Sequence, residues 1–374
     1  MKRLVLLGGG HAHVHVLKAI GEALDPTVSV TLVSPVSVQV YSGMVPGFVA
    51  GHYGLAECGV DLGPLAAKAR ALVARSAGAL ISTGRREVIL ANGESVPYDL
   101  LSIDIGSRPL VGDVIGVERH AVPVRPLETF VTAWEETLAR ARRGAVQSVS
   151  VVGGGAAGLE IAFAMDHRFR AELGARAPHV RVLTDQPDVL MEYGPGVRER
   201  LKRLARKRNV GLHPMSRVAE VGPDFVRLKD NLQFASDATF WVAGAGAHTL
   251  FRDSGLETDE RGFLLVDDFM QSVSHPDILA AGDCATSRDN PRPKAGVFAV
   301  RAGPALAFNL RAKLTGQPLR DHVTRRRFLA LISCGDRRAV GVYGPLSFEG
   351  RWVWAWKDRI DRAFLARYRA DEES

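Results

Sequence analysis

Two glycine-rich turns are the parts of this chain best suited to chemistry. They are Gly8-Gly9-Gly10-His11-Ala12-His13 and Gly153-Gly154-Gly155-Ala156-Ala157-Gly158, and each follows a short apolar run and precedes a helix-like stretch. Glycines let a backbone approach a pyrophosphate that sits on a helix N-terminus. One such turn is a weak signal, whereas two in one chain predict that it holds two dinucleotides.

A third motif, Gly282-Asp283, follows an apolar segment at 278–281. An aspartate at a strand end is suited to bind the ribityl hydroxyls of a flavin, although Gly-Asp by itself is a common turn. Together with the two glycine turns, it predicts a flavin and a nicotinamide, between which a hydride passes.

The residues expected to bind ribose depart from the usual pattern in both units. The second strand of such a unit normally ends in a carboxylate, but here the strands end in Ser34-Pro35 and in Thr184-Asp185. A serine still bonds a ribose hydroxyl, with less charge assistance. Asp185 is placed to hold a ribose and no arginine stands immediately beside it, which favours NADH over NADPH.

Histidines replace part of the first glycine pattern. His13 stands where a third glycine normally allows close packing of helix on strand, and His11 also lies in the turn. Two interpretations stay open, because the histidines either fill space or contact the pyrophosphate or flavin. The second interpretation is favoured for His11, and the first for His15.

The elements around these turns form a repeat. Each unit is expected to run strand, glycine turn, helix, strand, with β-branched residues in the strands. The expected elements are strands at 4–7 and 28–33 with a helix at 14–24, and strands at 148–152 and 180–183 with a helix at 159–173. The repeat predicts a duplicated α/β architecture with two Rossmann-like dinucleotide-binding domains.

Composition limits the class of protein. The chain has 374 residues, a net charge of +7 and a pI near 9.5. This charge favours anionic partners, but no nucleic-acid motif accompanies it, so no nucleic-acid partner is expected. Cys58, Cys284 and Cys334 form no CxxC pair, which favours a reducing, cytoplasmic location. No metal site is expected, and no apolar run approaches the ~18 residues that cross a bilayer.

The chain resembles the two-dinucleotide flavoproteins, a family that includes glutathione reductase and the type II NADH:quinone oxidoreductases. In particular, it resembles the FAD-dependent oxidoreductases found alone or fused ahead of selenide, water dikinase. The resemblance covers nearly the whole chain, and the blocks that carry it are 8–13, 41–47, 51–53, 102–107, 293–301 and 349–352.

This resemblance implies the glutathione-reductase-like fold, with FAD at the first turn and a nicotinamide at the second. It places Glu160 beside the nicotinamide and flavin N5, and Lys294 against the isoalloxazine ring, where a lysine stabilises the anionic reduced flavin. Glu160 and Lys294 are therefore the predicted catalytic residues. The predicted cofactor contacts are Gly8, Gly10, His11, Ser34, Pro35, Gly106, Gly153, Gly155, Gly158, Asp185, Gly244, Gly282, Asp283, Lys294, Gly296, Val297 and Phe298.

Segments between the units indicate the domain boundaries. Asn92-Gly93 is a hairpin signal, and the apolar stretch at 98–106 ends in glycine, much as the stretch at 241–246 does. We expect a discontinuous FAD-binding domain (1–110 and 255–324), an NAD(P)-binding domain (111–254) and a small C-terminal segment (325–374).

Two departures from the family bear on the electron acceptor. Disulfide reductases of the family carry CxxxxC on the first domain, where this chain offers only Cys58, and the quinone reductases place glutamines where it has Val297 and Arg301. Electrons are therefore expected to pass directly from the flavin to a bound small molecule. The favoured acceptor is a quinone; the alternatives are a sulfur or selenium compound, or a non-catalytic flavin redox sensor.

Aromatic and basic residues gather near the C-terminus. Trp352, Trp354 and Trp356 alternate as on one face of a strand, and apolar residues then follow at helical spacing from Ile360 to Tyr368. A basic amphipathic helix suits an anionic membrane surface, which would place the protein on the cytoplasmic face of a membrane. The alternative is that the helix packs on its own domain or on the second subunit of a homodimer.

Overall fold

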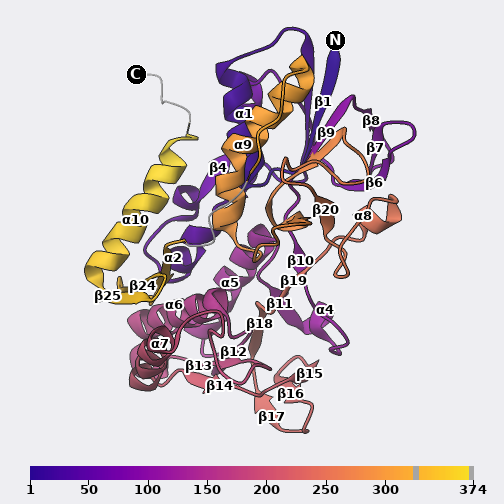
Figure 1. Cartoon of the computed structure of the whole chain (residues 1–374). Helices are drawn as coiled ribbons and strands as arrows, with labels where there is room; N and C mark the ends of the chain where they lie inside the picture. Colours follow the sequence, from indigo (N-terminus) through magenta and orange to yellow (C-terminus); the bar gives the residue numbers. More distant parts are fainter. Residues whose placement is uncertain (323–327, 370–374) are drawn as a thin grey trace.

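Two five-stranded parallel sheets form the body of the molecule (Figure 1). The computed structural model describes residues 1–322 and 328–369, so the predicted boundary between residues 324 and 325 lies outside the described residues. The first sheet has the strand order β21-β9-β1-β2-β5. Its strands are β1 (Lys2–Leu7), β2 (Val28–Val33), β5 (Leu72–Ala74), β9 (Leu100–Ile103) and β21 (Ile278–Ala280).

The second sheet repeats this arrangement with the order β11-β18-β12-β13-β14. Its strands are β11 (Ala121–Pro123), β12 (Ser148–Val152), β13 (His179–Leu183), β14 (Gly211–His213) and β18 (Ala238–Trp241). In each sheet the strand before the glycine turn pairs in parallel with the strand after the following helix, as a βαβ unit requires. The predicted α/β class and duplicated units are therefore confirmed.

The two helices that follow the glycine turns begin earlier than expected. Helix α1 (His11–Glu22) and helix α6 (Ala156–Leu173) start directly after Gly10 and Gly155, which are extended N-cap residues. Helix α9 (Gly296–Thr315) lies beside α1 on the first sheet, in the upper part of Figure 1. The other helices are α2 (Val45–Val49), α3 (Leu62–Lys68), α4 (Val117–His120), α5 (Leu127–Arg142), α7 (Pro195–Arg208) and α8 (Leu250–Asp253).

Smaller pieces of two or three strands complete both halves, all of them antiparallel except one parallel pair at 264–266 and 285–287. The Asn92-Gly93 hairpin is confirmed, because it joins β7 to β8 with Gly93 at φ +87°. The antiparallel pair β10–β19 links the two crossover connections between the sheets. These strands are β3 (Val38–Val40), β4 (Gly59–Asp61), β6 (Gly78–Ser82), β7 (Glu87–Leu90), β8 (Ser95–Pro97), β10 (Arg108–Pro109), β15 (Val218–Val221), β16 (Phe225–Leu228), β17 (Gln233–Ala235), β19 (Ala245–Gly246), β20 (Leu264–Val266) and β22 (Ala285–Ser287).

The C-terminal segment forms three antiparallel strands followed by one long helix. They are β23 (Ala330–Ser333), β24 (Ala339–Tyr343), β25 (Leu346–Gly350) and α10 (Arg351–Ala366). The expectation that the tryptophans lie on a strand is wrong, because α10 already includes them. Buried positions recur along the helix from Val353 through Asp361 to Leu365. Helical spacing therefore begins among the tryptophans and not only after them.

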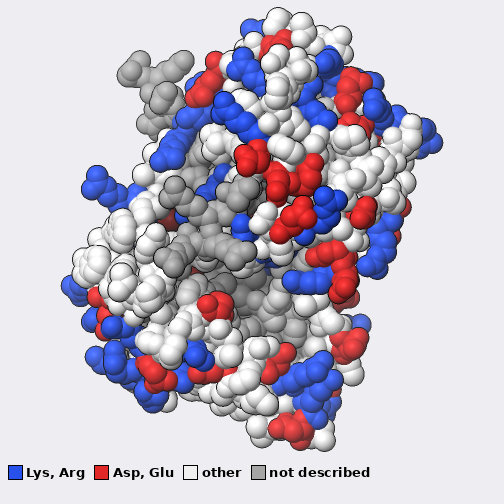
Figure 2. All heavy atoms as spheres, in the orientation of Figure 1, with Lys and Arg blue, Asp and Glu red and all other residues white. Residues whose placement is uncertain are grey.

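Charged side chains of both signs are mixed over the face shown in Figure 2, with lysines and arginines prominent around α7 at its lower left. No helix in the described ranges is long and apolar enough to cross a membrane.

Candidate functional site

A cavity of about 1050 Å³ opens at the carboxyl ends of the first sheet's strands. It runs from the first glycine turn past Ser34 and Gly106 to Asp283 and Gly296. Ligand pockets in proteins commonly have volumes of ~300–1,000 Å³, so a dinucleotide is a fitting occupant. The position also agrees with the rule that open α/β sheets bind ligands outside the carboxyl ends of their strands.

The first glycine turn leaves no room for side chains. A Cβ on Gly8 would lie 2.3 Å from the backbone oxygen of Asp104, and one on Gly10 would lie 2.3 Å from the carboxyl group of the same residue. A Cβ on Gly9 would lie 2.5 Å from Leu62. The turn therefore presents bare backbone to the cavity, which is the surface that a pyrophosphate needs.

His13 has a structural role. Its ring is fully buried, with Nδ1 2.6 Å from the Gly8 oxygen and Nε2 2.8 Å from Ser102 Oγ. Because a carbonyl only accepts, Nδ1 carries the proton and Nε2 accepts from the serine. Burial lowers the pKa of His13 to about 4, so the ring is neutral. The imidazole thus fills the space that a third glycine would have closed.

His11 lines the large cavity, and its Nε2 has no hydrogen-bond partner among the described residues. His248, from the crossover after β19, also lines the cavity with an unpartnered Nε2. Burial lowers the pKa of both rings to about 4. Two neutral, unsatisfied ring nitrogens at one cavity indicate that a polar ligand completes them. The residues of the large cavity therefore fit a dinucleotide.

Asp283 lies on the wall between this cavity and a smaller one of about 90 Å³. Its carboxylate is 2.9 Å from the guanidinium of Arg125, which also bonds Ser107 Oγ. Gly282 precedes it at φ +75° and has no space for a Cβ beside Asp104. The aspartate is therefore held in a fixed position against the cavity, as its predicted contact with the ribityl chain requires.

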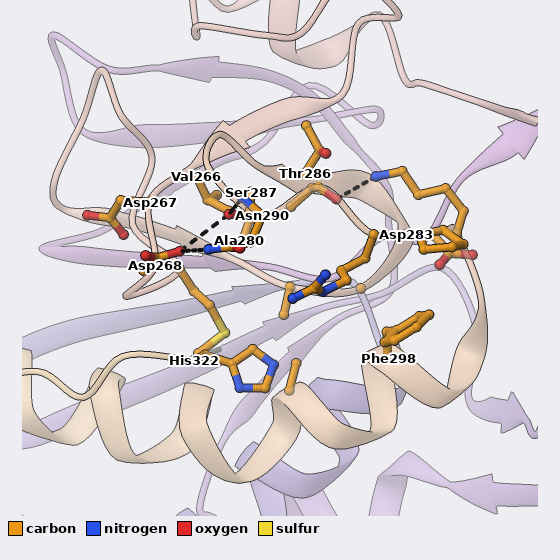
Figure 3. A pocket seen from close by; sticks show the side chains of 18 residues that line it. Val266, Asp267, Asp268, Ala280, Asp283, Thr286, Ser287, Asn290, Phe298 and His322 are labelled. Carbon is orange, nitrogen blue, oxygen red and sulfur yellow. Dashed lines mark hydrogen bonds between the residues drawn. The ribbon is translucent and has the colours of Figure 1, made fainter. Parts of the chain in front are cut away.

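Lys294 lies apart from the large cavity. It lines the smaller cavity instead, which Figure 3 shows, together with Asp268, Phe298 and His322. Lys294 Nζ donates to the Ala285 oxygen at 2.5 Å and stands 3.9 Å from the ring centre of Phe263. Neither Lys294 nor Phe298 is among the described residues that line the large cavity, whereas Gly296 is. The catalytic role of Lys294 stays a prediction.

The second glycine turn keeps a glycine at its last position, Gly158, where the first turn has His13. A Cβ on Gly158 would lie 1.9 Å from the Gly153 oxygen, so only glycine fits there. Thr184 closes the turn from the other side, because a Cβ on Gly154 would lie 2.7 Å from its side chain. The side-chain amide of Gln186 donates to the exposed Asp185 carboxylate at 3.1 Å.

A carboxylate occupies the start of α6. Glu192 Oε1 accepts from the backbone N–H of Ala156 at 3.1 Å, while the Leu190 N–H donates to the Gly154 oxygen at 2.8 Å. The loop between β13 and α7 therefore lies over the second turn. The N–H at the start of the helix, which is suited to a pyrophosphate, is bonded to the chain's own side chain.

Glu160 lies where three parts of the chain meet. Its carboxylate accepts from the backbone N–H of Ser333 at 2.7 Å. Burial raises the pKa of Glu160 to about 7, against the opposing effects of nearby Lys357 and of the Ser333 bond. Lys357 Nζ is 2.6 Å from Asp361 and also donates to the Gly43 oxygen. The adjacent residue, Ser42, lines the large cavity, so this segment connects the surroundings of Glu160 with it.

Four functional candidates were not predicted from the sequence: Asp104, Arg125, Glu192 and Lys357. The sequence does contain a signal for Asp104, because this carboxylate follows an otherwise apolar strand. Arg125 and Glu192 carry no local pattern and become neighbours of the turns only through the fold. Gly244 lies at φ +63° against Leu110, in the crossover.

The cysteines do not form a redox pair. Cys58, Cys284 and Cys334 are all free and buried, and burial raises the pKa of each thiol to about 12. Within the described ranges no group of His, Cys, Asp and Glu side chains could hold a metal ion.

Comparisons with known proteins agree with this geometry. Residues 2–303 match the family model described as pyridine nucleotide-disulphide oxidoreductase. A probable NADH dehydrogenase of Dictyostelium discoideum is 28% identical over 262 residues, which span 65% of this chain and 58% of that protein. An NADH dehydrogenase-like protein of Bacillus subtilis is 21% identical over 94% of this chain and 95% of its own. The sulfide:quinone oxidoreductase of Aquifex aeolicus has a similar fold, with a TM-score of 0.82, 16% identity, and coverage of 99% of this chain and 92% of that one.

Proposed function

Because the chain belongs to the pyridine nucleotide-disulphide oxidoreductase family, we propose that it is an NADH dehydrogenase that passes electrons to a quinone. FAD and NAD(P)H are the cofactors of this family and of this chain. When bound, FAD accepts a hydride from the nicotinamide and delivers electrons to an acceptor. The chain's residues bind, orient and exclude water around that chemistry.

Each part of the large cavity has a task in this proposal. The bare backbone of Gly8–Gly10 would hold the pyrophosphate and Ser34 would lie at the adenosine ribose. Asp283, fixed by Arg125, would orient the ribityl chain. The unpartnered Nε2 of His11 would hydrogen-bond to the cofactor. Predicted contacts at Pro35 and Gly106 also line this cavity.

NADH is the proposed hydride donor. The loop after β13 carries three carboxylates, those of Asp185, Asp188 and Glu192, and Glu192 bonds the Ala156 N–H at the second turn. Asp188 forms ion pairs with Lys202 at 3.0 Å and with Arg198 at 3.6 Å, whereas Asp185 and Glu192 form none with the described lysines and arginines. An additional 2′-phosphate would meet this negative charge, which supports NADH over NADPH.

The observation that carries the choice of acceptor is the state of the three thiols. All are buried and protonated at neutral pH, so none relays electrons to a disulfide. The flavin would therefore deliver electrons directly to a small molecule, at the junction of Glu160, β23 and α10. A quinone suits this junction, because the two-electron reduction of a quinone also needs protons. Glu160 holds a proton near pH 7 at that junction. The Aquifex aeolicus protein of similar fold is a sulfide:quinone oxidoreductase, which is consistent with this choice.

The exposed face of α10 supports attachment to an anionic membrane surface, where a lipid quinone would be met. Trp352, Trp356 and Ile360 are 58%, 40% and 42% exposed. Arg359 and Arg367 are also exposed, while Phe364 packs into the first domain. In Figure 2 uncharged atoms gather at the left edge, around the start of α10 and β25. A second copy of the chain is the alternative partner for this face.

Anaerobic titration with NADH tests the proposed function. The purified protein should be yellow, and NADH should bleach its flavin absorbance, more efficiently than NADPH. The reduced protein is then mixed with menadione, polysulfide or oxygen in parallel. Rapid reoxidation by menadione supports the proposal, and rapid reoxidation by polysulfide alone contradicts it. If the protein binds FAD tightly but NADH does not reduce the flavin, the protein would be a redox sensor instead.

A further inference from the structure

A carboxyl group lies beneath the first glycine turn. Asp104 follows β9 and is only 2% exposed. Its Oδ2 accepts from the backbone N–H groups of Ala12 at 2.7 Å and His13 at 3.2 Å, and its backbone oxygen accepts from the Gly10 N–H at 3.1 Å. The N–H groups at the start of α1, which normally attract an external anion, therefore already bond an internal carboxyl group.

Two glycines are required by this carboxyl group as well as by the ligand. A Cβ on Gly10 would lie 2.3 Å from Asp104 Oδ1, and a Cβ on Gly282 would lie 2.4 Å from the same oxygen. Asp104 also lines the large cavity. A pyrophosphate on the glycine turn would thus lie on the same backbone segment that Asp104 bonds.

No positively charged side chain among the described residues balances a negative charge on Asp104. On the segment after β21 it faces Asp283, whose own ion-pair partner is Arg125, and the Cys284 thiol. On α1 it accepts from the backbone of His13, and the rings of His13 and of His11 at the start of this helix are neutral. Among the described residues no lysine or arginine forms an ion pair with Asp104. Burial, together with Asp283, raises the pKa of Asp104 to about 7, even though two backbone N–H groups lower it.

We propose that Asp104 couples FAD binding to proton uptake, because the pyrophosphate occupies the start of α1 only when this carboxyl group is protonated. The two negative charges of the pyrophosphate disfavour a neighbouring carboxylate. Binding of FAD therefore raises the affinity of Asp104 for its proton, and by linkage the proton strengthens the binding of FAD. The proposal depends on FAD as the cofactor and is independent of the electron acceptor.

The direction of the effect follows from the two protonation states. Below pH 7 Asp104 is already protonated in the FAD-free protein, so FAD binding takes up no proton and the affinity is constant. As the pH rises above 7, each FAD bound must bring a proton with it. The Kd for FAD then rises by up to about tenfold per pH unit. His11 and His248 do not contribute, since both titrate near pH 4.

FAD titration of the full-length chain, freed of its flavin, tests this proposal between pH 5.5 and 8.5. Quenching of flavin fluorescence gives the Kd, and calorimetry in two buffers with different ionisation enthalpies gives the protons taken up. Wild type should take up close to one proton at pH 8.5 and almost none at pH 5.5. Asp104→Asn should show a constant Kd and no uptake, and at pH 8.5 should bind FAD about tenfold or more tightly than wild type.

Asp99→Asn is the matched control, because Asp99 is a partly exposed carboxylate just before the same strand and pairs with Arg3. It should keep the wild-type pH dependence. A Kd for wild type that does not change with pH, or an Asp104→Asn variant that keeps the slope, would overturn the proposal. Loss of affinity in Asp104→Asn at every pH would also overturn it, by showing that the carboxylate is only a helix cap. If this variant does not fold, proton uptake by wild type still decides.

Discussion

The carboxylate of Glu160 accepts a hydrogen bond from the backbone N–H of Ser333, and this 2.7 Å contact ties helix α6 to the C-terminal sheet. Lys357 and Asp361, from α10, are the charged side chains that act on its pKa, in opposite directions. A carboxyl group with a pKa of about 7 is half protonated at neutral pH, which is the condition under which a proton donor works best.

Replacing Glu160 by Gln should remove one limb of the pH profile of quinone reduction. In wild type the rate should fall as the pH rises above 7, because the protonated carboxyl group is the donor. Glu160→Gln should be slower by about 100-fold at pH 6 and nearly independent of pH. Steady-state rates with menadione from pH 5.5 to 9 measure this. Glu172→Gln, at the far end of the same helix, should keep the wild-type profile.

The repeat of two βαβ units could be predicted from local sequence because its signals are local. Glycine turns, β-branched strands and the Asn92-Gly93 hairpin each act over a few residues, and all were found in place. The helix that carries the three tryptophans could not be placed, since alternation is compatible with one face of a strand until burial at Val353 and Asp361 is known.

Several predicted site residues that belong to a recognisable local motif line one cavity, and their roles stay predictions. Gly8, His11, Ser34 and Asp283 meet at one cavity as expected. The ion pair of Arg125 with Asp283 brings together residues that are far apart in the sequence, and the carboxylate of Asp104 reaches α1 from a neighbouring strand. Such contacts depend on sheet order, which no local pattern contains.

Glu192 should compete with NADH for the start of α6. Its carboxylate bonds the Ala156 N–H in the structure, so a pyrophosphate must displace it and overcome its negative charge. Glu192→Gln should therefore bind NADH about threefold to tenfold more tightly, a gain of roughly 0.7–1.4 kcal/mol. The NADH concentration that half-saturates flavin reduction in stopped flow measures this. Glu199→Gln, an exposed carboxylate on α7, should leave it unchanged, and weaker binding by Glu192→Gln would refute the competition.

Asp104 should also make the stability of the FAD-free protein depend on pH. The pKa is about 7 in the folded chain and ~3.9 in an unfolded one, so the folded state binds more protons between these values. Stability from this group is present at low pH and is lost as the pH rises towards 7, by up to about 1.4 kcal/mol per unit. Asp104→Asn should therefore unfold at a higher temperature than wild type at pH 8, and the difference should shrink at pH 5. Thermal unfolding at both values checks this, and a difference that is larger at pH 5 would contradict it.

The exposed face of α10 should bind anionic lipid. Trp352→Ala combined with Trp356→Ala removes two exposed aromatic side chains without touching the buried contacts of Phe364 and Leu365. Co-sedimentation with vesicles of phosphatidylglycerol should fall several-fold, while FAD content stays at the wild-type level. Leu72→Ala, an exposed apolar residue on the first domain, is the control. Equal sedimentation of all three proteins, together with a dimer that the double variant disrupts, would assign this face to a second copy of the chain.

Gly158 and His13 occupy corresponding positions in the two turns, but they should respond differently to substitution. Gly158→Ala would place a Cβ 1.9 Å from the Gly153 oxygen, so backbone must move. NADH binding should be lost while FAD stays bound. His13→Ala instead leaves a cavity and two buried groups, Gly8 O and Ser102 Oγ, without partners, at a cost of ~2–4 kcal/mol. The first domain should then lose thermal stability and FAD together. Flavin content and NADH reduction of both variants distinguish these outcomes, and retention of NADH binding by Gly158→Ala would show that the second turn is not the nicotinamide site.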